Sequence, residues 1–282
     1  MGGGYSFPMV TLSRDRVVVV TGGNRGLGYE TAKWIAMLGA TVILACRSVE
    51  NGRKAIEKLN KEFQEEKNKG TKGLCEYDEL SMDVMELDLS SLASAKKFVK
   101  EYLDSGRSLH ILICNAGVAM CPPEITEDGY ELHFQANYLG HFLLCAELLP
   151  LMEANGEDCR IILVSSFMHL NCGFDTKRIQ GIFPYTLYDR IIHYGRSKLY
   201  QASFKTTYQG ATVTIDAAVN PDKPDSPYYT NNRPSHHSST SRSEDYQKRL
   251  WIYTLDCLKP FMMAEVWNRL TSFIRAVETD DT

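Results

Sequence analysis

Apolar strand-like runs alternate with stretches of helical periodicity along this chain, and this alternation limits the fold more than any other feature. The runs expected as strands are Arg16–Val20, Thr41–Cys46, Met82–Leu87, His110–Cys114, Arg160–Val164 and Thr212–Val219. The stretches expected as helices are 27–38, 49–68, 91–104, 124–154 and 188–208. Strands that are apolar almost throughout indicate a parallel sheet with helices on both faces. We therefore predict an α/β fold with a doubly wound parallel sheet that binds ligands at the carboxyl ends of its strands.

The first expected strand leads into a glycine-rich turn, Thr21-Gly22-Gly23-Asn24-Arg25-Gly26-Leu27-Gly28, which a helical pattern follows. Glycines let the backbone turn tightly and approach a ligand closely. The free amides and the positive dipole end of the following helix favour an anionic group there. The spacing Gly-x-x-x-Gly-x-Gly differs from the dinucleotide fingerprint Gly-x-Gly-x-x-Gly. By itself, the turn therefore fits either a phosphate site or an ordinary strand-to-helix connection.

Composition and charge argue against several kinds of protein. Hydrophobic residues make up 44% of the 282 residues, which is enough for a full core. The formal charge of −4 argues against a nucleic-acid partner bound through bulk charge. The eight scattered cysteines form no Cys-x-x-Cys pair, which indicates buried, reduced thiols in a cytoplasmic protein.

The sequence contains neither a secretory signal nor an apolar run of about 18 residues, so we expect no transmembrane span. The start, Met1-Gly2-Gly3-Gly4-Tyr5-Ser6, fits the pattern for N-myristoylation, but no cysteine or basic cluster nearby supplies a second anchor. We interpret residues 1–14 as a flexible leader, with a weak lipid anchor and peripheral membrane association as the alternative. His236-His237 lacks a third ligand at a familiar spacing, so we expect no metal site.

Polar residues follow the expected strands at the edge where a ligand should bind. They are Asp88-Leu89 after the third strand, Asn115-Ala116-Gly117 after the fourth, Ser165-Ser166 after the fifth, and Tyr194 and Lys198 in the next helix. Each has an ordinary alternative: a helix cap for Asp88, turn positions for Asn115 and Gly117, and a surface pair for the last two. Their occurrence at successive strand ends favours a shared site.

Tyr194 and Lys198 are four residues apart, so on a helix they share a face. A free tyrosine has a pKa near 10, and a neighbouring ammonium would lower the pKa by favouring the phenolate. The tyrosine could then act as a general acid or base near neutral pH. A serine hydroxyl beside it could stabilise charge on the substrate oxygen.

With these motifs in this order, the chain resembles the short-chain dehydrogenase/reductase family from Arg16 to Pro221. The resemblance rests on Thr21-Gly22-x-x-x-Gly26-x-Gly28, Asp88, Asn115-Ala116-Gly117, Asn137, Ser166 and Tyr194-x-x-x-Lys198. Three phrases are similar to the retinol-dehydrogenase-like and WW-domain-containing-oxidoreductase-like branch: Val42-Ile-Leu-Ala-Cys-Arg47, Asn137-Tyr-Leu-Gly-His-Phe142 and Arg160-Ile-Ile-Leu-Val-Ser-Ser166. No WW domain and no membrane-anchoring leader is expected ahead of the fold. The resemblance implies a single Rossmann-type domain and an oxidoreductase.

The resemblance also implies a role for each site residue. Tyr194 would exchange a proton with the substrate oxygen, and Lys198 would lower the pKa of Tyr194 and hold the nicotinamide ribose. Ser166 would orient the carbonyl or hydroxyl group of a small lipophilic substrate such as a retinoid, a steroid, or another ketone or aldehyde. Asn137 would position a water molecule in a proton relay to Lys198. Asn115 would lie against the cofactor, and Asp88 would bind the adenine amino group.

The cofactor can be predicted from the residues around the adenosine ribose. An acidic residue after the second strand would bind a ribose hydroxyl and repel a 2′-phosphate. Here that strand ends at Cys46 and Arg47 follows, while Arg25 lies in the glycine turn. Two guanidinium groups fit a phosphate, which arginine binds bidentately. We therefore predict NADP(H) rather than NAD(H).

The chain departs from the family pattern after Pro221, where Asp222 replaces the expected glycine and the substrate lid is missing or rearranged. We expect the Rossmann domain to span 15–221 and an atypical loop-and-helix segment to span 222–282. Its helical part, Glu244–Val277, should break or kink at Pro260 and pack on the sheet. A lid excludes water from a site, so the alternative to an active enzyme is a catalytically weak nucleotide-binding scaffold. Helices 124–154 and 188–208 would form a homodimer by analogy with the family.

Overall fold

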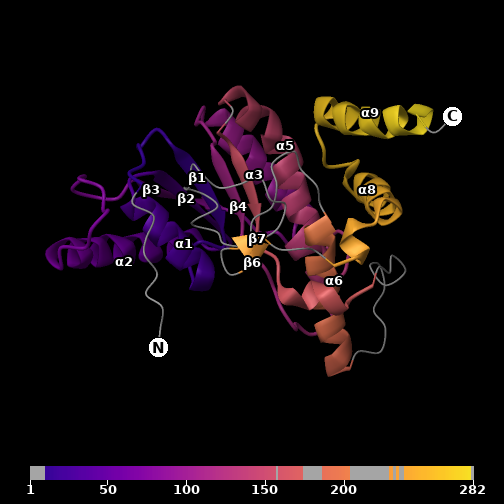
Figure 1. Cartoon of the computed structure of the whole chain (residues 1–282), viewed down its shortest axis with the longest axis horizontal. Coiled ribbons are helices and arrows are strands. Elements are labelled where there is room, and N and C mark those ends of the chain that lie inside the picture. The colour runs from indigo at the N-terminus through magenta and orange to yellow at the C-terminus, as the bar shows by residue number, and fades with distance from the viewer. Residues whose placement is uncertain are drawn as a thin grey trace.

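The structure is a computed structural model that describes residues 10–156, 158–173, 186–203, 229–230, 233–234 and 238–280. Its centre is a five-stranded sheet in the order β3-β2-β1-β4-β5 (Figure 1), and all its strand pairs are parallel. The strands are β1 (Val17–Thr21), β2 (Thr41–Cys46), β3 (Met82–Glu86), β4 (Ile111–Cys114) and β5 (Arg160–Leu163). The expected strand 212–219 and the boundary at Pro221 lie outside the described residues.

Helices cover both faces of the sheet, so the side chains of each central strand enter two separate cores. Val18 and Val20 of β1 pack in one core with helices α1 (Gly26–Met37) and α2 (Val49–Asn68). Val19 packs in the other core, which also contains the helices of the opposite face. Those helices are α3 (Leu92–Asp104), α5 (Gly140–Ala154) and α6 (Leu187–Ser203). This is the predicted α/β, doubly wound Rossmann-type fold in a single domain.

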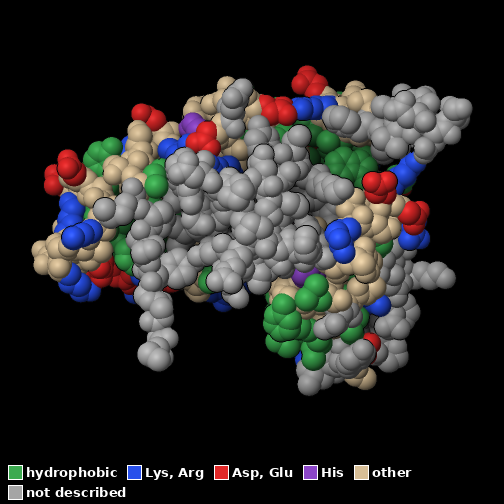
Figure 2. Space-filling model, in the orientation of Figure 1, with side chains coloured by type: hydrophobic (Ala, Val, Ile, Leu, Met, Phe, Trp, Pro, Cys, Tyr) green, Lys and Arg blue, Asp and Glu red, His purple; other side chains and the backbone are tan. Residues whose placement is uncertain are grey.

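The helices differ in how much water they contact. Figure 2 shows Lys and Arg side chains beside Asp and Glu side chains over α2, which has one apolar stripe (Ala55, Leu59 and Phe63) facing the sheet. By contrast, every residue of α5 from Gly140 to Leu148 is buried. A helix that is apolar on all sides must be covered on all sides.

The segment expected as one helix over 124–154 was predicted wrongly at its start. Residues 126–131 form a turn in which the Thr126 N–H donates to the Tyr130 carbonyl at 2.9 Å, and Gly129 adopts a φ of 86°. A short helix, α4 (Leu132–Phe134), and a π-helical turn (Gln135–Leu139) then lead into α5. The dipeptide Asp128-Gly129 is a turn signal that the helical periodicity obscured.

The C-terminal segment ends in two helices, α8 (Glu244–Leu258) and α9 (Ala264–Asp280), and the expected break at Pro260 lies between them. Before them, β6 (Tyr229–Thr230) and β7 (Arg233–Pro234) form a separate antiparallel pair. Helix α8 lies beside α5 and α6 (Figure 1), and its buried side chains join the hydrophobic core on that face of the sheet.

Aromatic contacts join α8 to the helices beneath it. The ring of Trp251 lies 5.2 Å from that of Phe142, and the ring of Tyr253 lies 6.1 Å from that of Phe134. The Tyr138 hydroxyl lies 2.8 Å from the Thr254 hydroxyl, and both side chains are buried. The outer faces of α4 and α5 are therefore covered by the chain's own C-terminal segment.

Substitution of the Tyr138–Thr254 pair should test the docking of α8. Thr254 donates its hydroxyl hydrogen to the Leu250 carbonyl at 2.7 Å, so Tyr138 must be the donor to Thr254. Thr254→Val would leave a buried O–H without an acceptor and should lower the free energy of unfolding by about 2 kcal/mol, against about 1 kcal/mol for Tyr138→Phe. In urea unfolding, the loss of stability in the double variant should be about 1 kcal/mol smaller than the summed losses of the two single variants. Additive effects would show that α8 does not dock here.

Candidate functional site

The glycine turn joins β1 to the uncapped start of α1. Gly22 and Gly26 adopt φ values of 64° and 58°, which favour glycine, and no side chain caps the first turn of α1. A Cβ on Gly26 would meet no atom within 4 Å, whereas one on Gly28 would collide with the Asn115 amide. The turn is therefore open on one side and packed against the β4 loop on the other, as a close approach to a phosphate requires.

The Thr21 hydroxyl joins this turn to the loop that follows β4. Its oxygen accepts hydrogen bonds from the backbone N–H groups of Asn115 and Ala116, both at 2.9 Å. The Asn115 side chain returns a hydrogen bond to the Thr21 carbonyl at 2.9 Å. The structure thus brings the predicted residues Thr21, Gly22, Asn115 and Ala116 together at the carboxyl edge of the sheet.

His141 extends this network into α5, although no sequence motif singled it out. Its Nδ1 lies 3.0 Å from the Asn137 carbonyl, which can only accept, so Nδ1 carries the proton. Its Nε2 is then an acceptor for the Thr21 hydroxyl at 3.0 Å. Burial lowers the pKa of His141 to about 4, which keeps the ring neutral and this donor order fixed at physiological pH.

A cavity of about 660 Å³ lies beside the glycine turn, between the start of α1 and α2. Its lining residues are Asn24, Arg25, Gly26, Tyr29, Glu30, Asn51, Lys54, Ala55 and Lys58. Four of them (Asn51, Lys54, Ala55 and Lys58) come from α2 and were not anticipated. Arg47 and Leu27 are exposed but do not line the cavity.

Asp88 and Leu89, after β3, have structural partners. One Asp88 carboxylate oxygen accepts from the Ser90 backbone N–H at 2.9 Å and from its hydroxyl at 2.6 Å. The alternative considered for Asp88 was a helix cap, but the residue that caps α3 is Ser91. Leu89 is buried, and a Cβ on Gly140 would lie 3.0 Å from it. The adenine contact of Asp88 remains a prediction.

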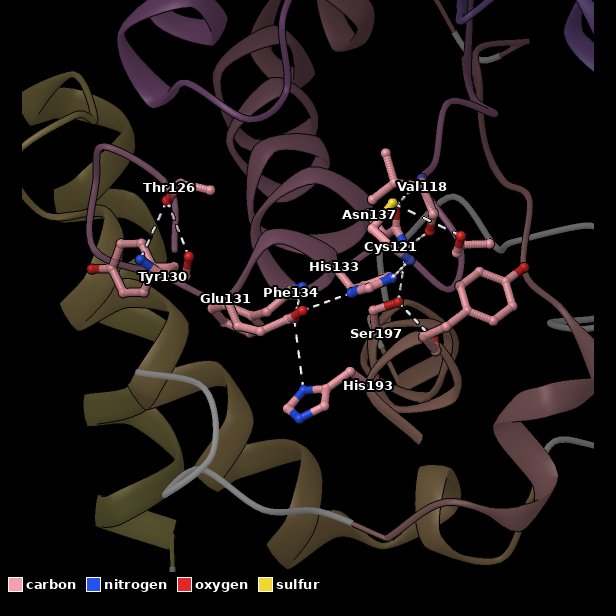
Figure 3. Close-up of polar contacts among 12 residues, drawn as sticks. Val118, Cys121, Thr126, Tyr130, Glu131, His133, Phe134, Asn137, His193 and Ser197 are labelled. Carbon is pink, nitrogen blue, oxygen red and sulfur yellow. Dashed lines mark hydrogen bonds and ion pairs between the residues drawn. The ribbon is translucent and has the colours of Figure 1, made fainter. Parts of the chain in front are cut away.

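Asn137 lies in the π-helical turn, fully buried (Figure 3). Its oxygen accepts from the Val118 N–H at 2.8 Å, and its amide donates to the Val118 carbonyl and to the Ser197 hydroxyl, both at 2.9 Å. Ser197 in turn donates to the Tyr194 carbonyl at 2.7 Å. Asn137 therefore links the β4 loop to the helix that carries Tyr194 and Lys198, and the water contact expected for it remains a prediction.

Lys198 is buried beneath this loop. Its ammonium donates to the Val164 carbonyl at 2.8 Å and to the Gln201 side chain at 2.9 Å. Burial lowers the pKa of Lys198 to about 8. A Cβ on Gly117 would lie 3.7 Å from the ammonium nitrogen and 3.1 Å from the Asn137 oxygen. Gly117, Asn137 and Lys198 therefore lie close together.

Tyr194 and Ser166 lie on neighbouring segments. Tyr194 is half-buried, and Ser166 caps a short 3-10 helix (Phe167–Asn171) that packs against α6. A Cβ on Gly195 would lie 3.0 Å from the Met168 carbonyl, so the two segments are in close contact. The Ser165 hydroxyl, just after β5, donates to the Lys198 carbonyl at 3.2 Å.

Glu131 and His133, two residues that the sequence reasoning missed, form a buried carboxylate–histidine pair (Figure 3). Glu131 accepts from His133 at 2.6 Å and from the Phe134 N–H at 2.9 Å. The other ring nitrogen of His133 accepts from the Cys121 N–H at 3.2 Å, and its ring lies edge-on to that of Tyr194 at 6.5 Å. The pair thus holds the far end of the β4 loop. Burial opposes ionisation of Glu131, but the hydrogen bonds and His133 outweigh burial and lower its pKa.

All eight cysteines are free thiols, and seven of them are buried. Within the described ranges, no group of three or more His, Cys, Asp or Glu side chains is arranged to bind a metal ion. No helix among the described residues is both long and apolar enough to cross a membrane.

Comparison with known proteins shows the family. Residues 16–174 match the short chain dehydrogenase family, and the chain belongs to it. That family consists of oxidoreductases that bind a nicotinamide cofactor, NAD or NADP, and act on small-molecule substrates. The fold resembles a crystal structure of an uncharacterised protein from Mycobacterium Paratuberculosis, with a TM-score of 0.69, 24% identity, and coverage of 89% of this chain and 95% of that one.

Curated relatives identify the branch that the sequence phrases indicated. Polyprenol dehydrogenase of Danio rerio is 36% identical over 80% of this chain and 67% of its own length. Retinol dehydrogenase 11 of Homo sapiens is 46% identical over 55% of this chain and 44% of its own length. WW domain-containing oxidoreductase of Gallus gallus is 35% identical over 65% of this chain and 42% of its own length. The matches to the last two span less than half of those relatives.

Removal of the buried charge should show what the Glu131–His133 pair contributes to stability. The neutral amide introduced by Glu131→Gln would offer one acceptor to two buried N–H donors, so the free energy of unfolding at pH 7 should fall by about 2 kcal/mol. The lowered pKa means that the charge-dependent part of this contribution is present above the unfolded-state pKa of about 4.5 and is lost as the pH falls through the folded-state pKa. Urea unfolding at several pH values measures this difference. Glu127→Gln, at an exposed position, is the control and should change stability by less than about 0.5 kcal/mol.

Proposed function

We propose that this chain is an NADP(H)-dependent carbonyl reductase or alcohol dehydrogenase for small lipophilic substrates. The observation that carries the proposal is the buried Lys198 ammonium, one helical turn from the half-buried Tyr194 and at the same sheet edge as the uncapped glycine turn. The open anion site would take the cofactor's phosphates, and the site residues would bind the reacting end. The matches to this chain span 67% of the Danio rerio polyprenol dehydrogenase and 44% of the human retinol dehydrogenase 11.

In the proposed mechanism, residues of this chain would transfer the proton and hold the reacting groups. A bound NADP(H) would supply the hydride acceptor or donor. Tyr194 would pass a proton to or from the substrate oxygen, and Ser166 would hold that oxygen by hydrogen bonding as charge develops on it. Lys198 would place a positive charge beside Tyr194 and hold the nicotinamide ribose. Asn137 would fix the loop that faces Lys198.

The basic side chains around the 660 Å³ cavity support NADP(H) over NAD(H). Arg25, Lys54 and Lys58 line it and outnumber the one acidic lining residue, Glu30, and exposed Arg47 follows the neighbouring strand. A 2′-phosphate would neutralise part of this charge, and arginine can bind it bidentately.

Charge reversal should therefore change the cofactor preference. Arg25→Asp and Arg47→Asp should each lower the ratio of NADPH to NADH affinity by about tenfold to a hundredfold, since a hydrogen bond to a charged group contributes about 1.5–3 kcal/mol. Fluorescence titration with both cofactors measures the ratio. Arg53→Asp, at an exposed position on α2 outside the cavity lining, is the matched control. An unchanged ratio in both test variants would contradict the NADP(H) assignment.

Exposed apolar side chains near the site support a lipophilic substrate. Phe167 directly follows Ser166 and is 72% exposed, and Leu170 on the same 3-10 helix is 53% exposed. Met120, in the loop after β4, is 53% exposed and adopts a φ of 53°, which is unusual for a residue other than glycine. Exposed apolar side chains gathered at the ends of two adjacent strands fit an apolar ligand.

Turnover decides between an enzyme and the alternative, a catalytically weak nucleotide-binding scaffold. Apolar aldehydes and ketones should be reduced in the presence of NADPH, and Tyr194→Phe should lower kcat by about a hundredfold or more because it removes the general acid. NADPH affinity should change little. Tight NADPH binding without Tyr194-dependent turnover of any tested carbonyl compound would favour the scaffold. The segment after Pro221 that motivated this alternative lies partly outside the described residues.

A further inference from the structure

Gln201 is the side-chain partner of the Lys198 ammonium. The two residues lie three positions apart on α6, and the exposed fractions are 1% for Gln201 and 4% for Lys198. The nitrogen of Lys198 lies 2.9 Å from the Gln201 amide oxygen. The contact between them is therefore held inside the protein, away from water.

The orientation of the Gln201 amide follows from the groups at its two ends. An ammonium can only donate, so the amide oxygen must face Lys198. The amide nitrogen then faces the carbonyl of Cys114, the last residue of β4, at a long distance of 3.5 Å. Gln201 thus bridges the lysine and the strand whose loop carries Gly117.

This arrangement uses two of the three N–H groups of Lys198. One donates to the Val164 carbonyl and one to Gln201. Exposed Gly117 lies close to the same nitrogen, since a Cβ there would be only 3.7 Å away. The remaining N–H is therefore the one that a ligand in front of Gly117 could use.

The surroundings of Lys198 make its charge dependent on such acceptors. Burial favours the neutral amine and lowers the pKa of Lys198 to about 8. The titratable groups that face it are the Cys114 thiol on β4, His141 on α5 and Tyr194 one turn earlier on α6. Burial raises the pKa of Cys114 and lowers that of His141, so both are neutral near pH 7. The acceptors that favour the ammonium are then the Val164 carbonyl and the Gln201 oxygen.

We propose that Gln201 is a positioning residue that keeps Lys198 charged and leaves its third N–H available to the cofactor. The inference rests on the proposed function, because it assigns Lys198 to cofactor binding. Gln201 acts through Lys198 and does not itself contact the reacting atoms.

The test measures NADPH affinity between about pH 6 and pH 10 in the full chain, since binding should weaken as Lys198 loses its proton. Gln201→Leu removes the acceptor and should move the midpoint of this loss down by about one pH unit, because a hydrogen bond to a charged group favours the charged form. Gln201→Glu restores an acceptor and adds a negative charge, so it should move the midpoint up. Gln247→Leu, on α8 and away from Lys198, removes a side-chain amide without touching the lysine and should not move it.

A merely structural role would lower the affinity at every pH and leave the midpoint unchanged, and that result in both Gln201 variants would overturn the inference. A second measurement follows the protonation of Lys198 itself and needs no bound cofactor. NMR titration of the Lys198 side-chain nitrogen, assigned with Lys198→Met, should show its pKa lowered in Gln201→Leu and raised in Gln201→Glu. Failure of the wild-type chain to bind NADPH or NADH would refute the proposed function, whereas unmoved Lys198 titration would refute the inference alone.

Discussion

The buried hydroxyl of Thr21 fixes the glycine turn after β1 relative to the loop after β4. It accepts from two backbone N–H groups after β4 and donates to His141, which donates to the Asn137 carbonyl. Thr21, Asn137 and His141 are all essentially inaccessible to water, so every one of these polar groups must find its partner within the protein. The position of the glycine turn therefore fixes the loop after β4 and, through α5, the turn that carries Asn137.

The two-faced core explains why this network can form at the sheet edge. Alternate residues of β1 enter separate cores, so the strand cannot slip by one residue without exchanging its two sets of side chains. Neighbouring parallel strands then end at the same edge of the sheet, so the loops that follow them lie close together. In the loop after β4, the Asn137–Val118 and His133–Cys121 hydrogen bonds fix two positions. Met120, with its strained backbone, lies between them.

Local signals were sufficient for most of the fold. The strands β1 to β5 lie within one residue of their expected bounds, and α2 matches at both ends, because continuous apolar runs and helical periodicity are properties of short stretches. The order of motifs also predicted the family, which the relatives confirm. The start of the 124–154 segment failed because Asp128-Gly129 forms a turn and a π-helical turn interrupts the helix. Hydrophobic periodicity does not distinguish such an interruption from a continuous helix.

The sequence by itself determined the order of strands and helices, the glycine turn, and the residue types that gather at the sheet edge. Only the tertiary structure decided which atoms meet: His141 on Thr21, Gln201 on Lys198, and α8 on the outer face of α5. The physical reason is that burial is a property of the whole packed chain. Thr21 and His141 are 120 positions apart, and no local sequence pattern predicts that both side chains are buried and that each needs the other as its hydrogen-bond partner.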